Sequence, residues 1–470
     1  MRPTGVKFLA KAADAVISGD PDRVVFDVKI DSRQAGEGDM FVCVTGENND
    51  GHNFIPGAYE NGCRVFLVSD EWKAAELVEK DPEVCCIIAG DTSIAFRDMA
   101  RACIDQFEIA RIGITGSVGK TSTRVYTAAV LGAKRRVISS QKNLNTHLGL
   151  CLTCFLADES TELIVFEMGM DRKNEIAEYV DWVFPETAVI TNVGISHMEK
   201  LGSRDAIADA KLEIVKNFGP ENILIYNSLS DYLNPQEIKR RAPGEYGLWA
   251  VGTSGDCHLR VYNIESPAEG GVSFTLESSS EKVDVHMQLL GKHNAIDAAL
   301  AASVGLRYGV DLKSAAQALA KVKPTYRRLD AVMLGSVYII DDTYNASPDS
   351  MKAALDVMGD IKAERKIAVL ADMLELGDAL ESGHREVGAC AGEKGIDVLY
   401  AIGSNAKLYC DAARSVNPSM QIIHAEKLQD IEPEITSSLR PGDAVLIKGS
   451  NITGVAGLAE RLREKFEKEE

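Results

Sequence analysis

The sequence predicts an α/β protein built from three domains. Its 470 residues are too many for one hydrophobic core. Short Val- and Ile-rich runs alternate with stretches of helical pattern, which is typical of parallel strands covered by helices on both faces. Pro324, in KVKPTYRRLD, separates two such alternating regions, because proline ends a helix and stiffens a linker. We therefore expect domains at residues 1–108, 109–323 and 324–470.

The elements follow in this order. In the first region, strands are expected in VVFDVKI, DMFVCV, RVFLV and CCIIAG. The second region begins with the strand ARIGIT, continues with the strands ELIVFEMG and TAVITNVG, and ends after the helix HNAIDAALAASVGL. The third region predicts a smaller Rossmann-like domain with strands in VYIIDD, IAVLADM, DVLYAIG, MQIIHA and AVLIKGS, but without a GxGxxG turn.

Composition excludes several classes of partner. The formal net charge of −19 argues against nucleic acid, which needs a basic surface. The sequence contains no uninterrupted run of 18 apolar residues, so no membrane span is expected. The N-terminal stretch does not have the pattern of a signal peptide. We therefore expect a cytoplasmic protein whose ten cysteines are reduced and mostly buried. Cys151 and Cys154 form a CxxC in a helix-like stretch, which favours core packing over redox or metal chemistry.

The strongest motif is GITGSVGKTS at residues 113–122, which lies between a predicted strand and a predicted helix. Backbone N–H groups of such a turn and the helix N-terminus hold phosphate oxygens, a lysine reaches the terminal phosphates and a hydroxyl binds Mg²⁺. Ile114 replaces the first glycine of the strict Walker A pattern, yet the GxxGxxGKT spacing predicts nucleotide binding. The expected binding residues are Gly116, Ser117, Gly119, Lys120, Thr121 and Ser122.

Two polar residues follow strands of the predicted central sheet. Glu167 comes after LIVF, where a carboxylate is placed to bind Mg²⁺, although a solvated strand-end acid is an equal alternative. His197 follows VITN and a short loop. Alone it favours a structural histidine, but its position at a strand end raises the metal-ligand interpretation.

Lys211 is anomalous. A helix is expected from Ser203, its N-cap, and on helical spacing the neighbours of Lys211 are the apolar Ile207, Ala208, Ile214 and Val215. A buried ammonium is costly, and burial lowers its pKa. The lysine is therefore either part of a buried ion pair, or snorkelling, or a functional lysine that is deprotonated and open to modification.

Polar residues also end three strands of the third region. Asp341 and Asp342 should point to opposite faces of their strand, so that both cannot be interior and one faces a site. Asp372 and Lys448 end two further strands. Together they outline a binding edge, although each alone is equally compatible with an ordinary loop residue.

Taken together, the motifs resemble the Mur ligases over nearly the whole chain and in the family's order. The N-terminal DSRQAGEGDMFVCVTGENNDGHNFIPGAYENGC resembles the family's uridine-nucleotide domain. GSVGKTST resembles the ATP loop, and KNLNTHLGL, FEMGM, TNVGISHMEKLGS, LLGKHNAIDAALAA and RRLD follow. DDTYNASPDSM resembles the branch that adds a dipeptide, with Ser347 in place of an asparagine, and no DNPR-like motif is present.

The resemblance implies a fold and a reaction. The fold would be a uridine-nucleotide-binding α/β domain, a P-loop ATPase-type domain with a parallel sheet and a Rossmann-like domain. The reaction would join D-alanyl-D-alanine to UDP-N-acetylmuramoyl-tripeptide through an acyl phosphate, with ATP, two Mg²⁺ ions and a monomeric enzyme. The sequence leaves the third residue of the tripeptide open.

The resemblance also implies residue roles. Lys120 would neutralise the transferring phosphate, and Thr121, Glu167, His197 and a carbamylated Lys211 would hold metal. Asn143 would lie near phosphate or metal, and Asn294, Arg328 and Asp342 would contact the nucleotide. Ser32 and Arg33 would lie in the uridine-nucleotide site. The alternatives are a lysine- or diaminopimelate-adding enzyme, a folylpolyglutamate synthase-like ligase, or a non-catalytic regulatory protein on the same scaffold.

Overall fold

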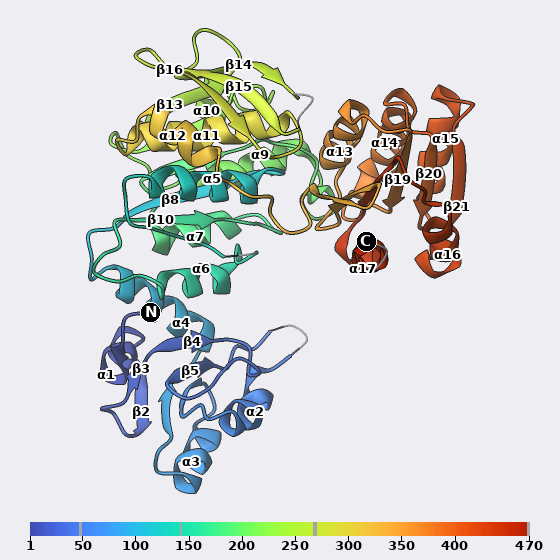
Figure 1. Ribbon diagram of the computed structural model, residues 1–470. Coiled ribbons are helices and arrows are strands. Elements are labelled where there is room, and N and C mark those ends of the chain that lie inside the picture. The colour runs from blue at the N-terminus through green and yellow to red at the C-terminus, as the bar shows by residue number, and fades with distance from the viewer. Residues whose placement is uncertain (47–48, 142, 267–269, 468–470) are drawn as a thin grey trace. The chain divides into compact units, whose positions relative to one another are not determined.

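The computed structural model describes residues 1–46, 49–141, 143–266 and 270–467. It confirms the α/β class (Figure 1). The chain divides into two compact units. The first comprises Met1–Ile114, Lys134–Met170 and Ile176–Ala188, and the second comprises Thr115–Ala133, Asp171–Glu175 and Val189–Glu470.

The N-terminal part of the first unit is a five-stranded sheet of order β2-β7-β6-β5-β4, in which only the β2–β7 pair is antiparallel. Its strands are β2 (Val16–Gly19), β4 (Asp27–Lys29), β5 (Asp39–Val42), β6 (Val65–Val68) and β7 (Cys85–Ile88). A short ribbon pairs β1 (Thr4–Gly5) with β3 (Val24–Val25). The helices are α1 (Val6–Ala12), α2 (Ile55–Glu60), α3 (Glu71–Lys80) and α4 (Thr92–Ile104). Asp70 and Asp91 cap α3 and α4 by accepting hydrogen bonds from first-turn amides.

The remainder of the first unit contains parallel strands that position Glu167. β10 (Leu163–Glu167) pairs with β8 (Ala110–Thr115) and with β9 (Val137–Ser139). The accompanying helices are α6 (His147–Cys154) and α7 (Glu175–Val183). Cys151 and Cys154 are fully buried in α6, which confirms their place in the core. Of the ten cysteines, all are unpaired and only Cys257 is partly exposed.

Strands of the second unit lie side by side in the order β16-β15-β14-β13-β12. They are β12 (Ile223–Asn227), β13 (Gly247–Gly252), β14 (Leu259–Glu265), β15 (Val272–Glu277) and β16 (Lys282–Met287), and β11 (Thr187–Ile190) is divided between the units. The expected alternation of strand and helix is wrong for β14, β15 and β16, which are antiparallel. Short connections allow only hairpins there, whereas parallel strands need a long crossover.

Helices of this part of the second unit carry five of the predicted site residues: Lys120, Thr121, Ser122, Lys211 and Asn294. They are α5 (Lys120–Gly132), α8 (Met198–Leu201), α9 (Arg204–Leu212), α10 (Pro235–Arg241), α11 (His293–Arg307) and α12 (Leu312–Leu319). Ser203 is the N-cap of α9, as expected, and its side chain accepts a hydrogen bond from the amide of Ala206. After α9 the chain tightens into a 3₁₀ turn at Glu213–Val215.

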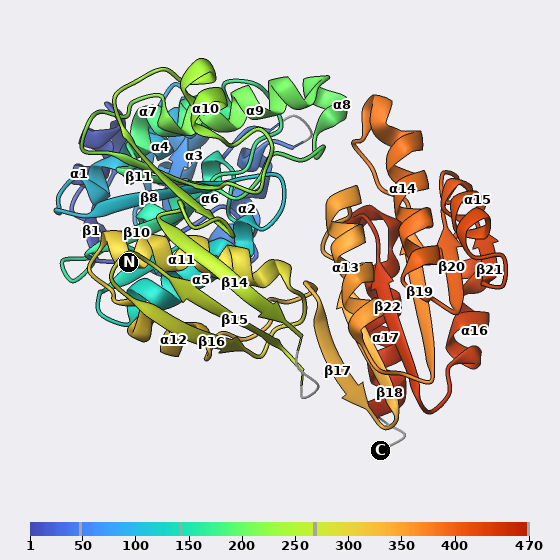
Figure 2. The same ribbon diagram turned by 90° about the horizontal axis from the view of Figure 1, so that it is seen from above.

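The C-terminal part of the second unit is a six-stranded sheet of order β17-β18-β22-β19-β20-β21, parallel except for β17. Its strands are β17 (Asp330–Leu334), β18 (Val337–Asp342), β19 (Arg365–Ala371), β20 (Val398–Ile402), β21 (Gln421–Ala425) and β22 (Asp443–Lys448). One face is covered by α13 (Pro348–Asp360), α14 (Leu380–Glu393) and α15 (Lys407–Val416), and the other by α16 (Leu428–Ser438) and α17 (Val455–Glu467) (Figure 2). Across the described ranges, no helix combines the length and the apolar character that crossing a bilayer requires.

Candidate active site

The glycine turn after β8 adopts a backbone that only glycine tolerates. Gly116 has a φ of 151° and Gly119 a φ of 82°, both positive. A Cβ on Gly116 would lie 1.8 Å from Thr191 Oγ1, so a side chain there would also collide with Thr191, the residue that directly follows β11. The turn leads directly into α5, which begins at Lys120. The predicted strand, turn and helix are therefore present in the predicted order.

The segment after β11 braces this turn. Asn192 Oδ1 accepts hydrogen bonds from the amides of Ser117 at 3.2 Å and Val118 at 3.0 Å. Ser117 Oγ in turn accepts one from the amide of Gly194 at 2.9 Å. Two of the loop amides are thus engaged inside the protein, and a phosphate would compete with Asn192 for them. The sequence reasoning missed Asn192.

Two cations meet at the start of α5. Lys120 Nζ donates to the carbonyl oxygens of Gly116 at 2.7 Å and Ser117 at 3.2 Å, so its ammonium lies over the turn. Arg328 Nη2 donates to Thr121 Oγ1 at 3.1 Å, and its guanidinium lies 4.0 Å from the centroid of the Tyr344 ring. The structure therefore brings Arg328 to the turn from a distant part of the sequence, where positive charge can neutralise phosphate.

A buried carboxyl also reaches the turn, and the sequence reasoning overlooked it. Asp297 on α11 is 8% exposed, and a Cβ on Gly119 would lie 2.7 Å from its Oδ1. Burial raises the pKa of Asp297 to about 8, although Thr123 and Arg328 act in the opposite direction. The carboxyl is therefore mostly protonated at neutral pH, so it adds little negative charge beside a site for phosphate.

Asn294, also on α11, is buried among internal partners. Its Oδ1 accepts from the Tyr126 hydroxyl at 2.5 Å, and its Nδ2 donates to Leu290 O at 2.7 Å. The side chain ties α11 to α5, on which Ser122 also lies. A contact between Asn294 and a nucleotide stays a prediction.

Lys211 is as buried as its helical spacing predicts. It is 1% exposed on α9, and Ile207, Ala208 and Ile214 around it are fully buried. Asp205 and Asp209 lie on another face and pair with Arg241. Burial, with a smaller contribution from the positive charge of Lys120, lowers the pKa of Lys211 well below its ordinary value. Burial therefore favours the neutral amine, which is the form that can react with carbon dioxide.

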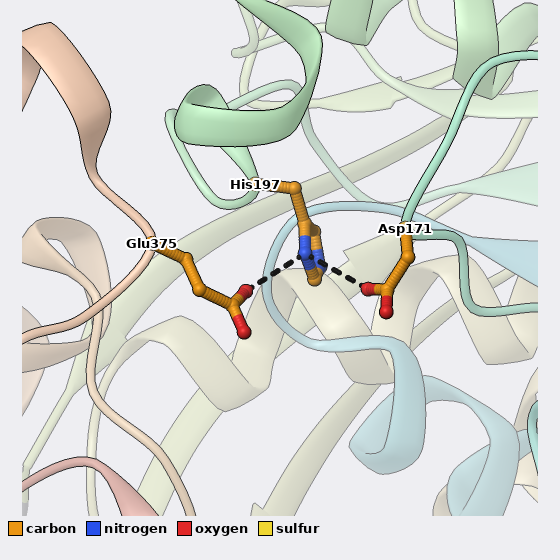
Figure 3. A group of neighbouring side chains, drawn as sticks. All are labelled: Asp171, His197 and Glu375. Carbon is orange, nitrogen blue, oxygen red and sulfur yellow. Dashed lines mark ion pairs between the residues drawn. The ribbon is translucent and has the colours of Figure 1, made fainter. Parts of the chain in front are cut away.

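His197 is the N-cap of α8 and has a left-handed backbone, φ 64°. Its Nδ1 lies 3.0 Å from Glu375 Oε2 and 3.2 Å from Asp171 Oδ1 (Figure 3). Burial, with a smaller contribution from the positive charge of Lys120, lowers the pKa of His197 to about 4, so the ring is neutral at pH 7. Glu375 and Asp171 were missed because neither lies near His197 in the sequence.

In the first unit, Glu167 ends β10 and is 2% exposed, which excludes the solvated alternative. Its Oε1 accepts from Asn145 Nδ2 at 3.0 Å. Asn143 is exposed, and its carbonyl oxygen accepts from the amide of Asn145. Of the two asparagines in KNLNTHLGL, it is thus Asn145 that contacts the predicted metal ligand.

The N-terminal residues expected at a uridine nucleotide lie at the surface. Arg33 forms a two-bonded ion pair with Asp31, at 2.9 and 2.7 Å. This partner lowers the pKa of Asp31 to about 2. The carbonyl oxygen of Ser32 accepts from Asn61 Nδ2 at 3.0 Å.

The expectation that Asp341 and Asp342 cannot both be interior is wrong. They are 2% and 9% exposed, because helices cover both faces of the C-terminal sheet. Asp341 accepts from the amide and hydroxyl of Thr343, and Asp342 lies 2.6 Å from the ammonium of Lys448. Asp372 is also buried, and its Oδ2 accepts from Asn405. The polar residues at these strand ends are therefore buried, and each has a partner inside the protein.

Three family models match successive parts of the chain. Residues 25–105 match the model of the Mur ligase family catalytic domain, residues 114–305 the Mur ligase middle domain and residues 327–451 the Mur ligase glutamate ligase domain. UDP-N-acetylmuramoyl-tripeptide–D-alanyl-D-alanine ligase of Bacillus subtilis is 35% identical over 430 residues, 91% of each chain.

Solved structures agree with these matches. MurF from Acinetobacter baumannii is similar with a TM-score of 0.86, 26% identity and 99% coverage of both chains. MurF ligase from Thermotoga maritima in complex with ADP has a TM-score of 0.78 and 26% identity, covering 94% of this chain and 98% of that one. With its phosphate turn, its buried lysine and these matches along its length, this chain belongs to the Mur ligase family.

Proposed function

We propose that this protein joins D-alanyl-D-alanine to UDP-N-acetylmuramoyl-tripeptide, with cleavage of ATP to ADP and phosphate. The observation that carries the proposal is the 35% identity, across 91% of both chains, to a ligase of that name. The ADP complex of a similar structure and the glycine turn before α5 support the nucleotide. A diaminopimelate-adding ligase and a folylpolyglutamate synthase are similar at only 15% and 18% identity, which supports a shared fold and not a shared substrate.

The reaction runs in two steps. An oxygen of the tripeptide carboxylate attacks the γ-phosphorus, the bond to the bridging oxygen breaks, and ADP leaves. The dipeptide amine then attacks the acyl carbon, loses a proton, and the phosphate leaves from the tetrahedral intermediate. Lys120 and Arg328 neutralise charge on the transferred phosphoryl group, which lowers the barrier mainly by electrostatic stabilisation.

The residues fit Mg²⁺. His197 is neutral, so a ring nitrogen can donate a lone pair. Burial favours the neutral form of the Lys211 amine, which can attack carbon dioxide and lose a proton to give an anionic carbamate. We assign two ions to Thr121, His197, Lys211 and Glu167 on the family resemblance. The metal would supply charge for binding and polarising phosphate oxygens.

Further assignments stay proposals. They are the nucleotide contacts of Gly116, Ser117, Gly119, Ser122, Asn143, Asn294 and Asp342, the uridine site at Ser32 and Arg33, the three-domain division, and a monomer in the cytoplasm.

The decisive experiment is an acceptor screen. Phosphate release is measured at fixed concentrations of ATP and UDP-N-acetylmuramoyl-tripeptide while the acceptor amine is varied. The screen is run twice, with a tripeptide whose third residue is lysine and with one whose third residue is diaminopimelate. D-alanyl-D-alanine should stimulate release, and lysine, diaminopimelate and glutamate should not. Better stimulation by one of these amino acids would refute the assignment, and no acceptor-dependent release at all would favour a non-catalytic protein.

A further inference from the structure

Arg328 projects from a turn whose backbone is left-handed on both sides. Arg327 has a φ of 57° and Leu329 a φ of 47°. Residues other than glycine adopt this conformation only where the surroundings impose it. Here the amide of Arg328 donates to the carbonyl oxygen of Thr325 at 3.0 Å, and the amide of Leu329 donates to Asp342 Oδ1 at 3.1 Å. These contacts fix the main chain at Arg328, but they do not fix its long side chain.

The guanidinium of Arg328 packs on an aromatic ring. Its central carbon lies 4.0 Å from the centroid of the Tyr344 ring, and Nη2 donates to Thr121 Oγ1. Within the described ranges no carboxylate forms an ion pair with Arg328, whereas the adjacent Arg327 pairs with Glu460 at 2.6 Å. The face of Tyr344 is therefore the main side-chain surface that restrains this half-buried guanidinium.

Tyr344 lies on a segment that is itself fixed, two residues after the end of β18. Its amide donates to the carbonyl oxygen of Arg327 at 3.1 Å, so main-chain atoms tie the ring-bearing segment to the turn. On the other side of the ring, Lys448 Nζ donates to the carbonyl oxygen of Asn345 at 2.9 Å. Tyr344 is half-buried. Its ring is thus a well-supported surface against which a guanidinium can pack.

An aromatic face restrains a guanidinium without neutralising it. The cation is attracted to the electron-rich face, so its plane is held while the N–H groups at its edge stay available. A carboxylate partner would also hold the side chain, but it would cancel the charge and compete with phosphate for the N–H groups. Support by a ring therefore suits an arginine whose proposed task is to neutralise a phosphoryl group.

We propose that Tyr344 is a positioning residue for the reaction, holding Arg328 beside the glycine turn before the nucleotide binds. An arginine side chain has many rotamers in water, and the affinity for a ligand falls with the fraction of molecules in the competent one. The ring raises that fraction in the free enzyme. This inference rests on the phosphate-neutralising role proposed for Arg328.

The first test measures binding of β,γ-methylene-ATP with Mg²⁺ to the full-length protein by isothermal titration calorimetry. Tyr344→Leu removes the ring, and Tyr344→Phe keeps it. Tyr326→Leu is the matched control, because it removes an exposed ring that lies 4.8 Å from the neighbouring guanidinium of Arg327. Tyr344→Leu should weaken binding about fivefold, as Arg328 would occupy its place for about a fifth of the time. Tyr344→Phe and Tyr326→Leu should leave binding within about twofold.

Arg328→Ala tests the parent assignment and completes a double-mutant cycle. It should weaken binding more than Tyr344→Leu does, and adding Tyr344→Leu to it should change nothing further. If Arg328→Ala has no effect, the role of Arg328 fails and the inference fails with it. If Arg328→Ala weakens binding but Tyr344→Leu does not, or if the effect of Tyr344→Leu persists without Arg328, the positioning role is wrong. Neither tripeptide nor acceptor is present, so the outcome does not depend on which amine the enzyme uses.

A second readout observes Arg328 directly. In protein labelled with ¹⁵N-arginine, the Nε–H signal of Arg328 is identified by its loss in Arg328→Lys. The ring current of Tyr344 should shift this proton upfield in the nucleotide-free wild type and in Tyr344→Phe, and the shift should vanish in Tyr344→Leu. A general loss of stability would not produce this pattern. An unshifted signal in the wild type would contradict the proposal, even if Tyr344→Leu failed to fold.

Discussion

Asp297→Asn should change how stability depends on pH. The pKa of Asp297 is raised from 3.8 to about 8, chiefly by burial. Between these values the folded protein keeps a proton that the unfolded chain has lost, so stability is fully present below pH 3.8 and falls as pH rises to about 8. A difference of one bound proton between the folded and unfolded states lowers the free energy of unfolding by about 1.4 kcal/mol per pH unit. Raising the pH from 5 to 8 should therefore lower the contribution of this carboxyl to the free energy of unfolding by roughly 3–4 kcal/mol.

Asparagine has the shape of the protonated acid but does not titrate. Urea unfolding would be followed by the fluorescence of Trp249 on β13, in a background where Trp72 and Trp182 of the other unit are replaced by phenylalanine. Subtracting the two pH profiles removes the contributions of all other titrating groups. The Asp297→Asn protein should become the more stable one progressively from pH 5 to pH 8. Parallel profiles would show that Asp297 ionises normally and refute the reasoning.

Other variants test the remaining assignments. Lys120→Ala should lower turnover more than tenfold, roughly 1.4 kcal/mol of barrier, with an unchanged circular dichroism spectrum; activity within tenfold would exclude its phosphate contact. Lys211→Ala should remove activity, short-chain carboxylic acids should restore part of it, and a ¹³C-bicarbonate-derived carbamate signal should appear only in the wild type. Asp342→Ala should cost about 3–5 kcal/mol in unfolding experiments because it leaves the ammonium of Lys448 buried without its carboxylate. Combining Asp342→Leu with Lys448→Met should recover most of that loss, and equal losses in both proteins would show that the ion pair itself matters little.

Features encoded by neighbouring residues were predictable from sequence. The turn before α5 follows from a strand and spaced glycines, and the burial of Lys211 follows from apolar residues one helical turn away on each side. Both signals lie within about ten residues, where backbone geometry alone determines which side chains share a face.

Features that depend on distant segments were not. Asp297 lies in the alanine-rich α11, where nothing local indicates that it faces Gly119. Asp171 and Glu375 meet His197 only through the tertiary fold. The interior position of both Asp341 and Asp342 depended on helices covering each face of their sheet, which strand periodicity does not report.

The distribution of thiols gives the protein a built-in chemical probe. Nine of the ten cysteines are buried, and Cys257, in the turn between β13 and β14, is partly exposed with its Sγ 3.5 Å from Ser228 Oγ. A maleimide dye added to the native protein should therefore attach first and almost stoichiometrically at that turn, without any engineered cysteine. The other nine thiols should become reactive only as their surroundings open. Counting modified thiols by intact-protein mass spectrometry, as urea is raised, would then show which part of the chain loosens first.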